Sequence, residues 1–359
     1  MERILTVGVV GFGMSATVFH IPFVTTLPGY RLGAIVSRSV GHMVQGSHPD
    51  VAVYKSFEAL LQDTTIDLVV VTTPNKTHFP FAAQALQAGK HVVLEKPFTN
   101  TTDEASQLID IAHHSGRVLS VYQNRRYVSD FRTIKQLLAQ NKLGPIHEYE
   151  CHFDRYRPEA KENSWREEDK PGSGILYDLG SHLLDQALCL FGLPKTITAD
   201  IRRQRPHARV DDYFDIRLDF GFAKAILKSS MLVREMGPRY MVHGTLGSYI
   251  KYGDDPQEAM LKEGILPVRP DWGREPDTVM GLLHTEEDGK PVRNYIPSLP
   301  GNFGDYYTNL YQTITAGAPN WEKSEHGYNT IRLIELAFES NGQQRTLPCT
   351  GLLHAAYPA

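Results

Sequence analysis

ILTVGVVGFGMSA, residues 4–16, is the stretch that decides the fold of this 359-residue chain. Its apolar first half has the character of a buried strand, and it ends in two glycines one residue apart, Gly11 and Gly13. With Ala16 they form the G-x-G-x-x-A version of the dinucleotide-binding fingerprint. Gly11 allows the tight turn, Gly13 leaves no Cβ between the backbone and a pyrophosphate, and Ala16 lets the next helix pack close to the strand. The stretch therefore predicts a nucleotide-binding strand–turn–helix unit.

The helix after this turn should begin near Met14 and Ser15. A helix N-terminus offers unpaired N–H groups and the positive end of a dipole, so we expect both residues to face the phosphates. The helix should run towards Phe19 and His20, and Pro22 should interrupt and restart it.

The end of the second predicted strand, residues 30–36, bears on which dinucleotide is bound. Folds that bind NAD usually place Asp or Glu about twenty residues after the glycines, where it holds the ribose hydroxyls. Ser37 and Arg38 stand at that place here. A hydroxyl and a guanidinium bind a 2′-phosphate, which a carboxylate would repel. The pair favours NADP over NAD; the alternative is a surface loop that happens to contain an arginine.

Strand and helix patterns alternate up to residue 122, with later strands at residues 66–71, 91–94 and 118–122. Such alternation predicts a doubly wound parallel sheet. In these sheets ligands collect beyond the carboxyl ends of the strands. The residues at those ends that we expect to border the cofactor are Thr73, Pro74, Asn75, His78, Glu95 and Lys96. His78 is equally compatible with the first position of a helix that touches no ligand.

Lys96 lies in the segment Glu95-Lys96-Pro97, directly after a predicted strand. A lysine beside a nicotinamide ring can hydrogen-bond a substrate hydroxyl or pass its proton. A cis bond before Pro97 would hold the lysine inward, which we take as a hypothesis. Considered alone, a lysine in this position is more often an ordinary loop residue.

The pattern changes after residue 122, at the segment that contains Asn124. A helix is predicted over residues 131–139 and a half-buried strand over 146–157, where Tyr149, Cys151 and Phe153 alternate with polar residues. Further strands are predicted at 196–203, 213–220, 225–233 and 240–251, long loops over 253–300, and closing helices at 303–316 and 328–340.

A series of strands without alternating helices indicates an open, mostly antiparallel sheet. One face would be covered by helices, and the other would be a surface on which two subunits meet. The predicted fold is thus α/β, with an N-terminal doubly wound Rossmann domain at residues 1–122 and a C-terminal α+β domain at residues 123–359.

A helix predicted over residues 178–191 carries the chemistry of this second domain. Asp178, His182 and Asp185 are spaced i, i+4 and i+7, so they share one face. A carboxylate one turn from an imidazole can fix its tautomer or support its charge, which prepares a general base near neutral pH. The alternative is a capping aspartate and a core histidine that has its hydrogen bonds satisfied.

Composition narrows the class of protein. A formal charge of −4 without a basic run argues against nucleic acid and anionic membrane surfaces as partners. Three distant cysteines without a C-x-x-C favour a reducing compartment, and no window approaches a membrane span. We expect a cytoplasmic protein. The 15 histidines include no H-E-x-x-H, so we expect no catalytic metal.

The whole chain resembles the glucose–fructose oxidoreductase/inositol dehydrogenase (Gfo/Idh/MocA) family. The resemblance rests on Gly11-x-Gly13, Glu95-Lys96-Pro97 and Asp178-x-x-x-His182. A closer likeness to the NADP-dependent scyllo-inositol dehydrogenases is carried by VFHIP at 18–22, SVYQNRR at 120–126, FDRYRP at 153–158, SWR at 164–166 and YDLGSH at 177–182.

The resemblance implies that Lys96, Asp178 and His182 are catalytic. It also implies that the residues near the substrate, together with these three, are Asn124, Arg125, Arg155, Tyr156, Trp165 and Arg166. Many donors suit a ring with several hydroxyls. The arginines could instead select a carboxylate or phosphate, or form surface ion pairs.

The expected function is an oxidoreductase, an NAD(P)-dependent dehydrogenase, that moves hydride between nicotinamide and a polyol or cyclitol such as scyllo-inositol or its inosose. The pyridine ring would lie between two lobes, within reach of an amine from one and an imidazole from the other. One alternative substrate is an open-chain or pyranose sugar or a sugar acid. Another alternative is a non-catalytic NADP-binding regulator. The family implies a small-molecule substrate and a homodimer.

Overall fold

The computed structural model describes residues 3–37, 41–160 and 167–357 of the chain, and these divide into two compact units. The first comprises Met1–Asn124, Gln257–Trp272 and Asn302–Tyr328; the second comprises Arg125–Pro256, Gly273–Gly301 and Asn329–Ala359. We expected one boundary, at residues 122–123. The units change over after Asn124, and two later segments return to the first unit, which sequence patterns do not reveal.

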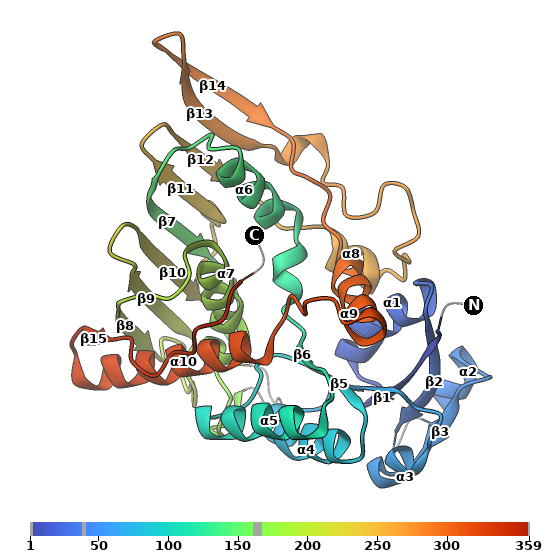
Figure 1. Cartoon of the computed structure of the whole chain (residues 1–359). Coiled ribbons are helices and arrows are strands. Elements are labelled where there is room, and N and C mark those ends of the chain that lie inside the picture. Colours follow the sequence, from blue (N-terminus) through green and yellow to red (C-terminus); the bar gives the residue numbers. More distant parts are fainter. Residues whose placement is uncertain (1–2, 38–40, 161–166, 358–359) are drawn as a thin grey trace. The chain divides into compact units, whose positions relative to one another are not determined.

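The first unit is built on a six-stranded parallel sheet (Figure 1). Its order is β3 (Ala52–Tyr54), β2 (Tyr30–Val36), β1 (Leu5–Val10), β4 (Leu68–Val71), β5 (His91–Leu94), β6 (Leu119–Val121). All residues of β1, β4 and β5 are buried because helices cover both faces of such a sheet. This strand order is that of the doubly wound dinucleotide-binding fold, so the predicted fold class is confirmed for this unit.

Helical segments connect the strands of this sheet. They are η1 (Ser15–His20), α1 (Ile21–Thr26), α2 (Gly41–Ser47), α3 (Phe57–Gln62), η2 (Asn75–Thr77), α4 (His78–Gln87) and α5 (Thr102–Ser115). Helices α4 and α5 lie side by side (Figure 1). The predicted interruption near Pro22 is confirmed: η1 is a π-helical turn that ends at His20, and α1 restarts with proline in its first turn.

The two returning segments contribute α8 (Gln257–Lys262) and α9 (Gly304–Ala316) to the first unit. Helix α8 contacts η1 and α9 contacts α1. Tyr307 of α9 stacks on Phe23 of α1 with ring centroids 6.3 Å apart, and it accepts a hydrogen bond at its carbonyl from the Tyr30 hydroxyl. The helix that follows the glycine turn is therefore backed by a segment almost three hundred residues away in sequence.

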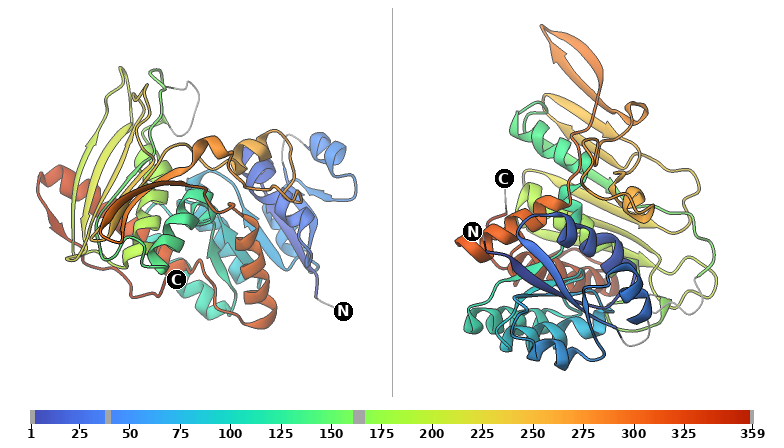
Figure 2. Two further views of the ribbon diagram at one scale, coloured as in Figure 1. Left: turned by 90° about the horizontal axis from the view of Figure 1, so that it is seen from above. Right: turned by 90° about the vertical axis from the view of Figure 1, so that its right-hand side faces the viewer.

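The second unit contains a nine-stranded sheet (Figures 1 and 2). Its order is β14 (Lys290–Ile296), β13 (Gly281–Glu287), β12 (Gly247–Lys251), β11 (Tyr240–Gly244), β7 (Ile146–His152), β10 (Lys224–Ser230), β9 (Tyr213–Asp219), β8 (Thr196–Arg202), β15 (Leu347–Pro348). Only the β7–β10 pair is parallel. The predicted open, mostly antiparallel sheet is confirmed.

Helices α6 (Ser129–Ala139), α7 (Ser181–Phe191) and α10 (Ser324–Gln343) complete this unit, apart from the start of α10. The Tyr240 hydroxyl of β11 donates to Gln186 of α7, and α10 accepts hydrogen bonds from the backbone of β8 through Ser340 and Asn341. Along β7 the helix-facing Tyr149 and Cys151 are fully buried, while Glu150 between them is half-buried. The alternation predicted for this strand is confirmed.

Two predictions about the C-terminal part of the chain are wrong. Residues 253–300 are not all loop, because they contain α8, η6 (Asp277–Val279) and the β13–β14 hairpin. Apolar and polar residues are mixed along these two strands, and most of their residues are half-buried or exposed, so the strands lack the regular apolar alternation of a half-buried strand. The single strand predicted at 240–251 is a hairpin that turns at Thr245 and the exposed Leu246.

The helix predicted over residues 178–191 is confirmed, and it ends at Phe191 as expected, but its first turn is not α-helical. It begins with a π-helical turn, η5 (Leu176–Gly180), and becomes α-helical only at Ser181. A π-turn holds more residues than an α-turn, so the angle between Asp178 and His182 around the helix axis differs from that of a regular α-helix. Among the described residues, no helix is both long and apolar enough to cross a membrane.

A buried ion pair stabilises the second unit. Lys251 Nζ lies 2.8 Å from Glu275 Oε2, and their side chains are 0% and 4% exposed. The hydroxyls of Ser129 and Ser298 also donate hydrogen bonds to Glu275. Its carboxylate therefore has three donors in the protein: one ammonium group and two hydroxyls.

We predict that Lys251→Met destabilises the second unit by about 3–5 kcal/mol, because it leaves a buried carboxylate without its counter-charge. The matched control is Lys228→Met, which removes a half-exposed lysine 3.8 Å from Asp215 and should cost less than about 1 kcal/mol. Thermal and urea unfolding of the full chain measure both. Equal losses in the two variants would contradict the prediction.

Candidate active site

The glycine turn after β1 has the shape that a dinucleotide requires. Gly11 has φ +104°, and a Cβ there would lie 2.9 Å from Thr72 Oγ1. Only glycine adopts this backbone conformation without strain. Gly13 is exposed, and a Cβ built on it would meet no atom within 4 Å. The open space beside Gly13 suits the close approach of a pyrophosphate, so the residues present fit a dinucleotide.

The predicted NADP pair is described in part. Ser37 directly follows β2, is buried, and donates its N–H to the Tyr54 carbonyl at 3.0 Å. Arg38 lies outside the described residues.

The carboxyl end of β4 is tied to that of β5 by His78. Its Nδ1 lies 2.8 Å from the Pro97 carbonyl oxygen and its Nε2 lies 2.9 Å from that of Thr73. Both ring nitrogens therefore face main-chain oxygens of two different loops. Burial lowers the pKa of His78, against the opposing effect of these carbonyls. Of its neighbours, Asn75 is buried and Pro74 is exposed.

The peptide bond between Lys96 and Pro97 is cis, as hypothesised. Glu95, one residue earlier, accepts three hydrogen bonds. The Ser15 hydroxyl donates to Oε1, His20 Nε2 lies 3.0 Å from the same oxygen, and the Lys96 N–H donates to Oε2 at 3.0 Å. This carboxylate therefore joins the glycine turn to the lysine segment.

Glu95 is ionised despite its position. Burial alone would raise the pKa of Glu95, but the hydrogen bond and charge of His20, with smaller effects of Ser15 and Lys96, lower it to about 2. His20 is fully buried, and its Nδ1 lies 2.7 Å from the Tyr307 hydroxyl.

In the second unit, η5 and α7 carry the other predicted catalytic residues. Asp178 is half-buried within the π-turn, and His182 is buried in the first turn of α7. Asp185, on the same helix, accepts two hydrogen bonds from Arg126 at 2.6 and 2.7 Å. This pair is buried at both ends, so it anchors α7 to the segment that carries Arg125.

Three arginines surround one aromatic ring close to His182. The ring of Phe153 lies 6.5 Å from that of His182, and the guanidinium carbons of Arg239, Arg155 and Arg125 lie 3.7, 5.2 and 5.6 Å from its centroid. Arg125 and Arg155 were predicted substrate residues. The structure brings them together with His182 in one cluster.

The other predicted substrate residues lie differently. Asn124 is buried at the start of η3 (Asn124–Tyr127). Tyr156 is 40% exposed and its ring is covered by the guanidinium of Arg234 at 4.0 Å. Trp165 and Arg166 lie outside the described residues.

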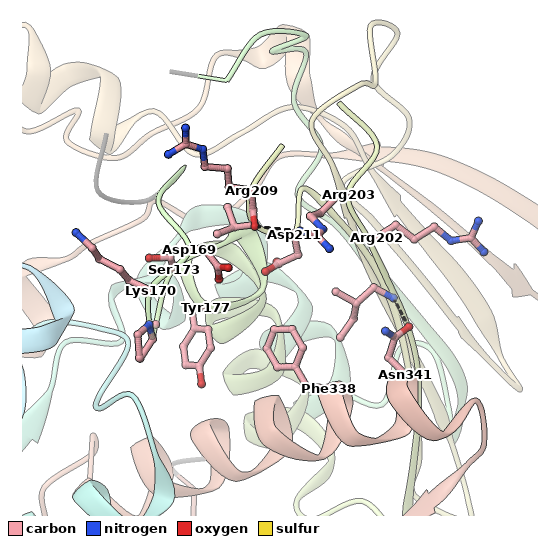
Figure 3. Close-up of a pocket in the computed structure, with 14 residues that line it drawn as sticks. Asp169, Lys170, Ser173, Tyr177, Arg202, Arg203, Arg209, Asp211, Phe338 and Asn341 are labelled. Atoms are coloured by element: carbon pink, nitrogen blue, oxygen red, sulfur yellow. Dashed lines mark hydrogen bonds between the residues drawn. The ribbon is translucent and has the colours of Figure 1, made fainter. Parts of the chain in front are cut away.

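A pocket of about 610 Å³ in the second unit contains none of the predicted site residues (Figure 3). Its lining includes Lys170, Arg202, Arg203, Arg209 and Asp211, but the side chains of Lys170, Arg202 and Arg209 point away from one another and do not converge (Figure 3). Within the described ranges, no three His, Cys, Asp or Glu side chains gather as metal ligands would.

Sequence reasoning missed three residues of these clusters: His20, Tyr307 and Arg239. His20 belongs to a motif that carried the family resemblance, so a signal for it existed. Tyr307 and Arg239 come from distant parts of the chain, and no local pattern connects them to Glu95 or Phe153.

Comparison with known proteins agrees with these two units. Residues 5–123 match the oxidoreductase family model described as an NAD-binding Rossmann fold, and residues 135–349 match the model of that family's C-terminal alpha/beta domain. The chain therefore belongs to the Gfo/Idh/MocA oxidoreductase family, and it is an NAD(P)-dependent dehydrogenase.

Individual relatives match over nearly the full length. The chain is 43% identical to the uncharacterized oxidoreductase YdgJ of Escherichia coli K12, covering 97% of this chain and 99% of the relative. It is 41% identical to the scyllo-inositol 2-dehydrogenase (NADP(+)) IolW of Bacillus subtilis, and the match covers 96% of this chain and 95% of the relative. A solved structure of the YvaA oxidoreductase from Bacillus subtilis superposes with a TM-score of 0.92 at 40% sequence identity. The superposition covers 97% of this chain and 99% of the YvaA chain.

We predict that Gly13→Ala leaves thermal stability almost unchanged but weakens cofactor binding at least about tenfold. The added methyl group meets no protein atom, yet it occupies the space that a pyrophosphate needs. Fluorescence titration with NADPH and thermal unfolding measure the two effects. Gly46→Ala, which also faces open space but lies in α2, is the control and should bind NADPH normally. Unaltered NADPH binding by Gly13→Ala would refute the assigned role of the turn.

Proposed function

We propose that this enzyme is an NADP(H)-dependent dehydrogenase of a polyol or cyclitol, such as scyllo-inositol or its inosose. The observation that carries the proposal is its full-length similarity to an NADP-dependent scyllo-inositol 2-dehydrogenase. Ser37 and Arg38 support the choice of NADP, because they offer a hydroxyl and a guanidinium where NAD-binding folds place an acid.

The catalytic residues of the proposal are Lys96, Asp178 and His182. In the oxidation direction the imidazole of His182 takes the proton of the substrate hydroxyl, and Asp178 holds that imidazole. The ammonium group of Lys96 donates a hydrogen bond to the same oxygen and stabilises the negative charge that develops on it. NADP, when bound, would supply nicotinamide C4 as the acceptor of the hydride. The carbon atom loses a hydride, the oxygen atom loses a proton, and the alcohol becomes a ketone.

The proposal also assigns a set of cofactor-binding residues. They are Gly11, Gly13, Met14, Ser15, Ser37, Arg38, Thr73, Pro74, Asn75, Glu95 and Lys96. His78, which we also expected to border the cofactor, is 1% exposed and is left out of this set. Hydrogen bonds from Ser15 to Glu95 and contacts from His78 to Thr73 and Pro97 join several of them into one edge of the first unit. This edge lies beyond the carboxyl ends of β1, β4 and β5, where such sheets bind nucleotides.

We predict that Lys96→Ala lowers kcat by about 10²–10³-fold, because a donor to the developing alkoxide is lost. The dissociation constant for NADPH should change little, since the glycine turn is intact. Steady-state kinetics in both directions and NADPH titration provide the measurements. A variant that turns over as fast as the wild-type enzyme would rule out the assignment of Lys96.

A second candidate is a sugar acid or sugar phosphate, and the arginine cluster favours it. The Arg239 side chain is 10% exposed, and it forms an ion pair at 3.7 Å with Asp254, whose side chain is 78% exposed. Within the described residues its Nε makes no hydrogen bond. With Arg125 and Arg155 it concentrates positive charge beside Phe153, which would attract a carboxylate or phosphate.

The two candidates separate in a substrate screen. Cyclitols, inososes, neutral sugars, sugar acids and sugar phosphates are each assayed by nicotinamide absorbance with NADP and with NAD. We expect the highest kcat/KM for a cyclitol or inosose with NADP. The second candidate would instead give the highest value for an anionic substrate, and Arg239→Met would then lower it about tenfold or more while sparing neutral substrates. No turnover of any substrate, with intact NADPH binding, would support a regulator.

A further inference from the structure

Two contacts to the main chain, one at Lys96 and one at Pro97, hold the segment that carries the Lys96 side chain. On one side the Lys96 N–H donates to Glu95 Oε2 at 3.0 Å, and on the other side the carbonyl of the next residue, Pro97, lies 2.8 Å from His78 Nδ1. Proline itself has no N–H to offer. These two contacts lead to two buried histidines, to His78 directly and to His20 through Glu95.

His20 reaches Glu95 from a position at the end of η1. Its Nε2 lies 3.0 Å from Glu95 Oε1, and its Nδ1 lies 2.7 Å from the Tyr307 hydroxyl. The His20 ring also packs on the ring of Tyr122, with 4.3 Å between the two ring centroids. The Tyr122 hydroxyl donates a hydrogen bond to the Phe19 carbonyl. The imidazole is therefore fixed in orientation, with one nitrogen directed at the carboxylate.

His78 reaches the segment from the start of α4. Its Nδ1 faces the Pro97 carbonyl and its Nε2 faces the Thr73 carbonyl, so the ring lies between the loops after β4 and β5. A neutral imidazole carries one N–H, and the role assigned below places it on Nδ1. His78 is 1% exposed and His20 is 0% exposed, so neither ring has free surface for a cofactor or substrate. Both contacts on the segment are to backbone or to Glu95, and neither depends on the placement of the Lys96 side chain.

We propose that His20 and His78 are positioning residues for Lys96: His20 orients Glu95, which holds the Lys96 amide, and His78 holds the Pro97 carbonyl. The inference rests on the proposed function, because Lys96 is the catalytic residue there. A displacement of about 1 Å can cost about 10²-fold in rate, so two anchors on the backbone are consistent with the demands of the reaction.

The two histidines use opposite ring nitrogens, which makes a sharp test possible. A glutamine side chain places its amide nitrogen near the position of Nε2, and an asparagine side chain places it near that of Nδ1. At residue 20 the contact that matters is made by Nε2, and at residue 78 it is made by Nδ1. Gln should therefore replace His20, and Asn should replace His78.

We expect His20→Gln and His78→Asn to keep kcat within about threefold of the wild-type value, and His20→Asn and His78→Gln to lower it about 30–100-fold. His91→Gln is the matched control. His91 is a buried histidine at the opposite end of β5, where its Nδ1 accepts the Val118 N–H. This control should lose thermal stability without losing kcat. If activity in the four variants follows thermal stability, or if both substitutions at one position act alike, the proposal is overturned.

Backbone amide exchange of Lys96 provides a readout that needs no turnover. We expect its protection in the full-length protein to persist in His20→Gln and to fall at least about tenfold in His20→Asn, with no change in His91→Gln. Unchanged protection in His20→Asn would overturn the proposal. Failure of the proposed function looks different: the wild-type enzyme would turn over no polyol or sugar, while the exchange pattern would still decide the role of His20.

Discussion

Glu95 carries a negative charge in a position with almost no access to water, and its three hydrogen-bond donors are what make that possible. A buried carboxylate is costly unless every such interaction is made. The donors come from the helix after the glycine turn and from the residue that follows Glu95 itself. The hydrogen bonds to this one carboxylate therefore fix the position of the glycine turn relative to the segment that carries Lys96.

The same requirement explains why a segment near the end of the chain returns to the first unit. His20 can serve Glu95 only if its second nitrogen is also satisfied, and Tyr307 of α9 meets that need at 2.7 Å. Tyr307 is in turn fixed by Tyr30 and Phe23. A helix far along the sequence thus supports the turn where the nucleotide is expected to bind.

In the second unit, too, a buried charged group with its hydrogen bonds satisfied joins two segments. Arg126 and Asp185 form two short hydrogen bonds in a buried setting, and they lock α7 to the segment that contains Arg125. The ring of Phe153 then lies near His182 and within reach of three guanidinium groups. This concentration of positive charge is the feature that bears most directly on the choice between a neutral and an anionic substrate.

Much of the fold follows from local sequence, because short-range patterns report burial. The apolar runs of β1, β4 and β5 and the glycines between β1 and η1 identify the parallel sheet, and the alternation in β7 identifies a half-covered one. The β13–β14 hairpin escaped prediction because both of its faces are partly exposed, so its sequence shows no regular apolar alternation. The π-turn that contains Asp178 escaped because it has no signature in residue spacing.

What the amino-acid sequence alone determined is the class of fold and the identity of the residues expected to be catalytic, since these rest on motifs a few residues long. Tertiary structure decided how those residues are supported. Tyr307 on His20, His78 on the Pro97 carbonyl and Arg239 on Phe153 each join segments distant in sequence. No local pattern encodes such contacts, because they depend on which buried polar groups the completed core leaves close enough to satisfy one another.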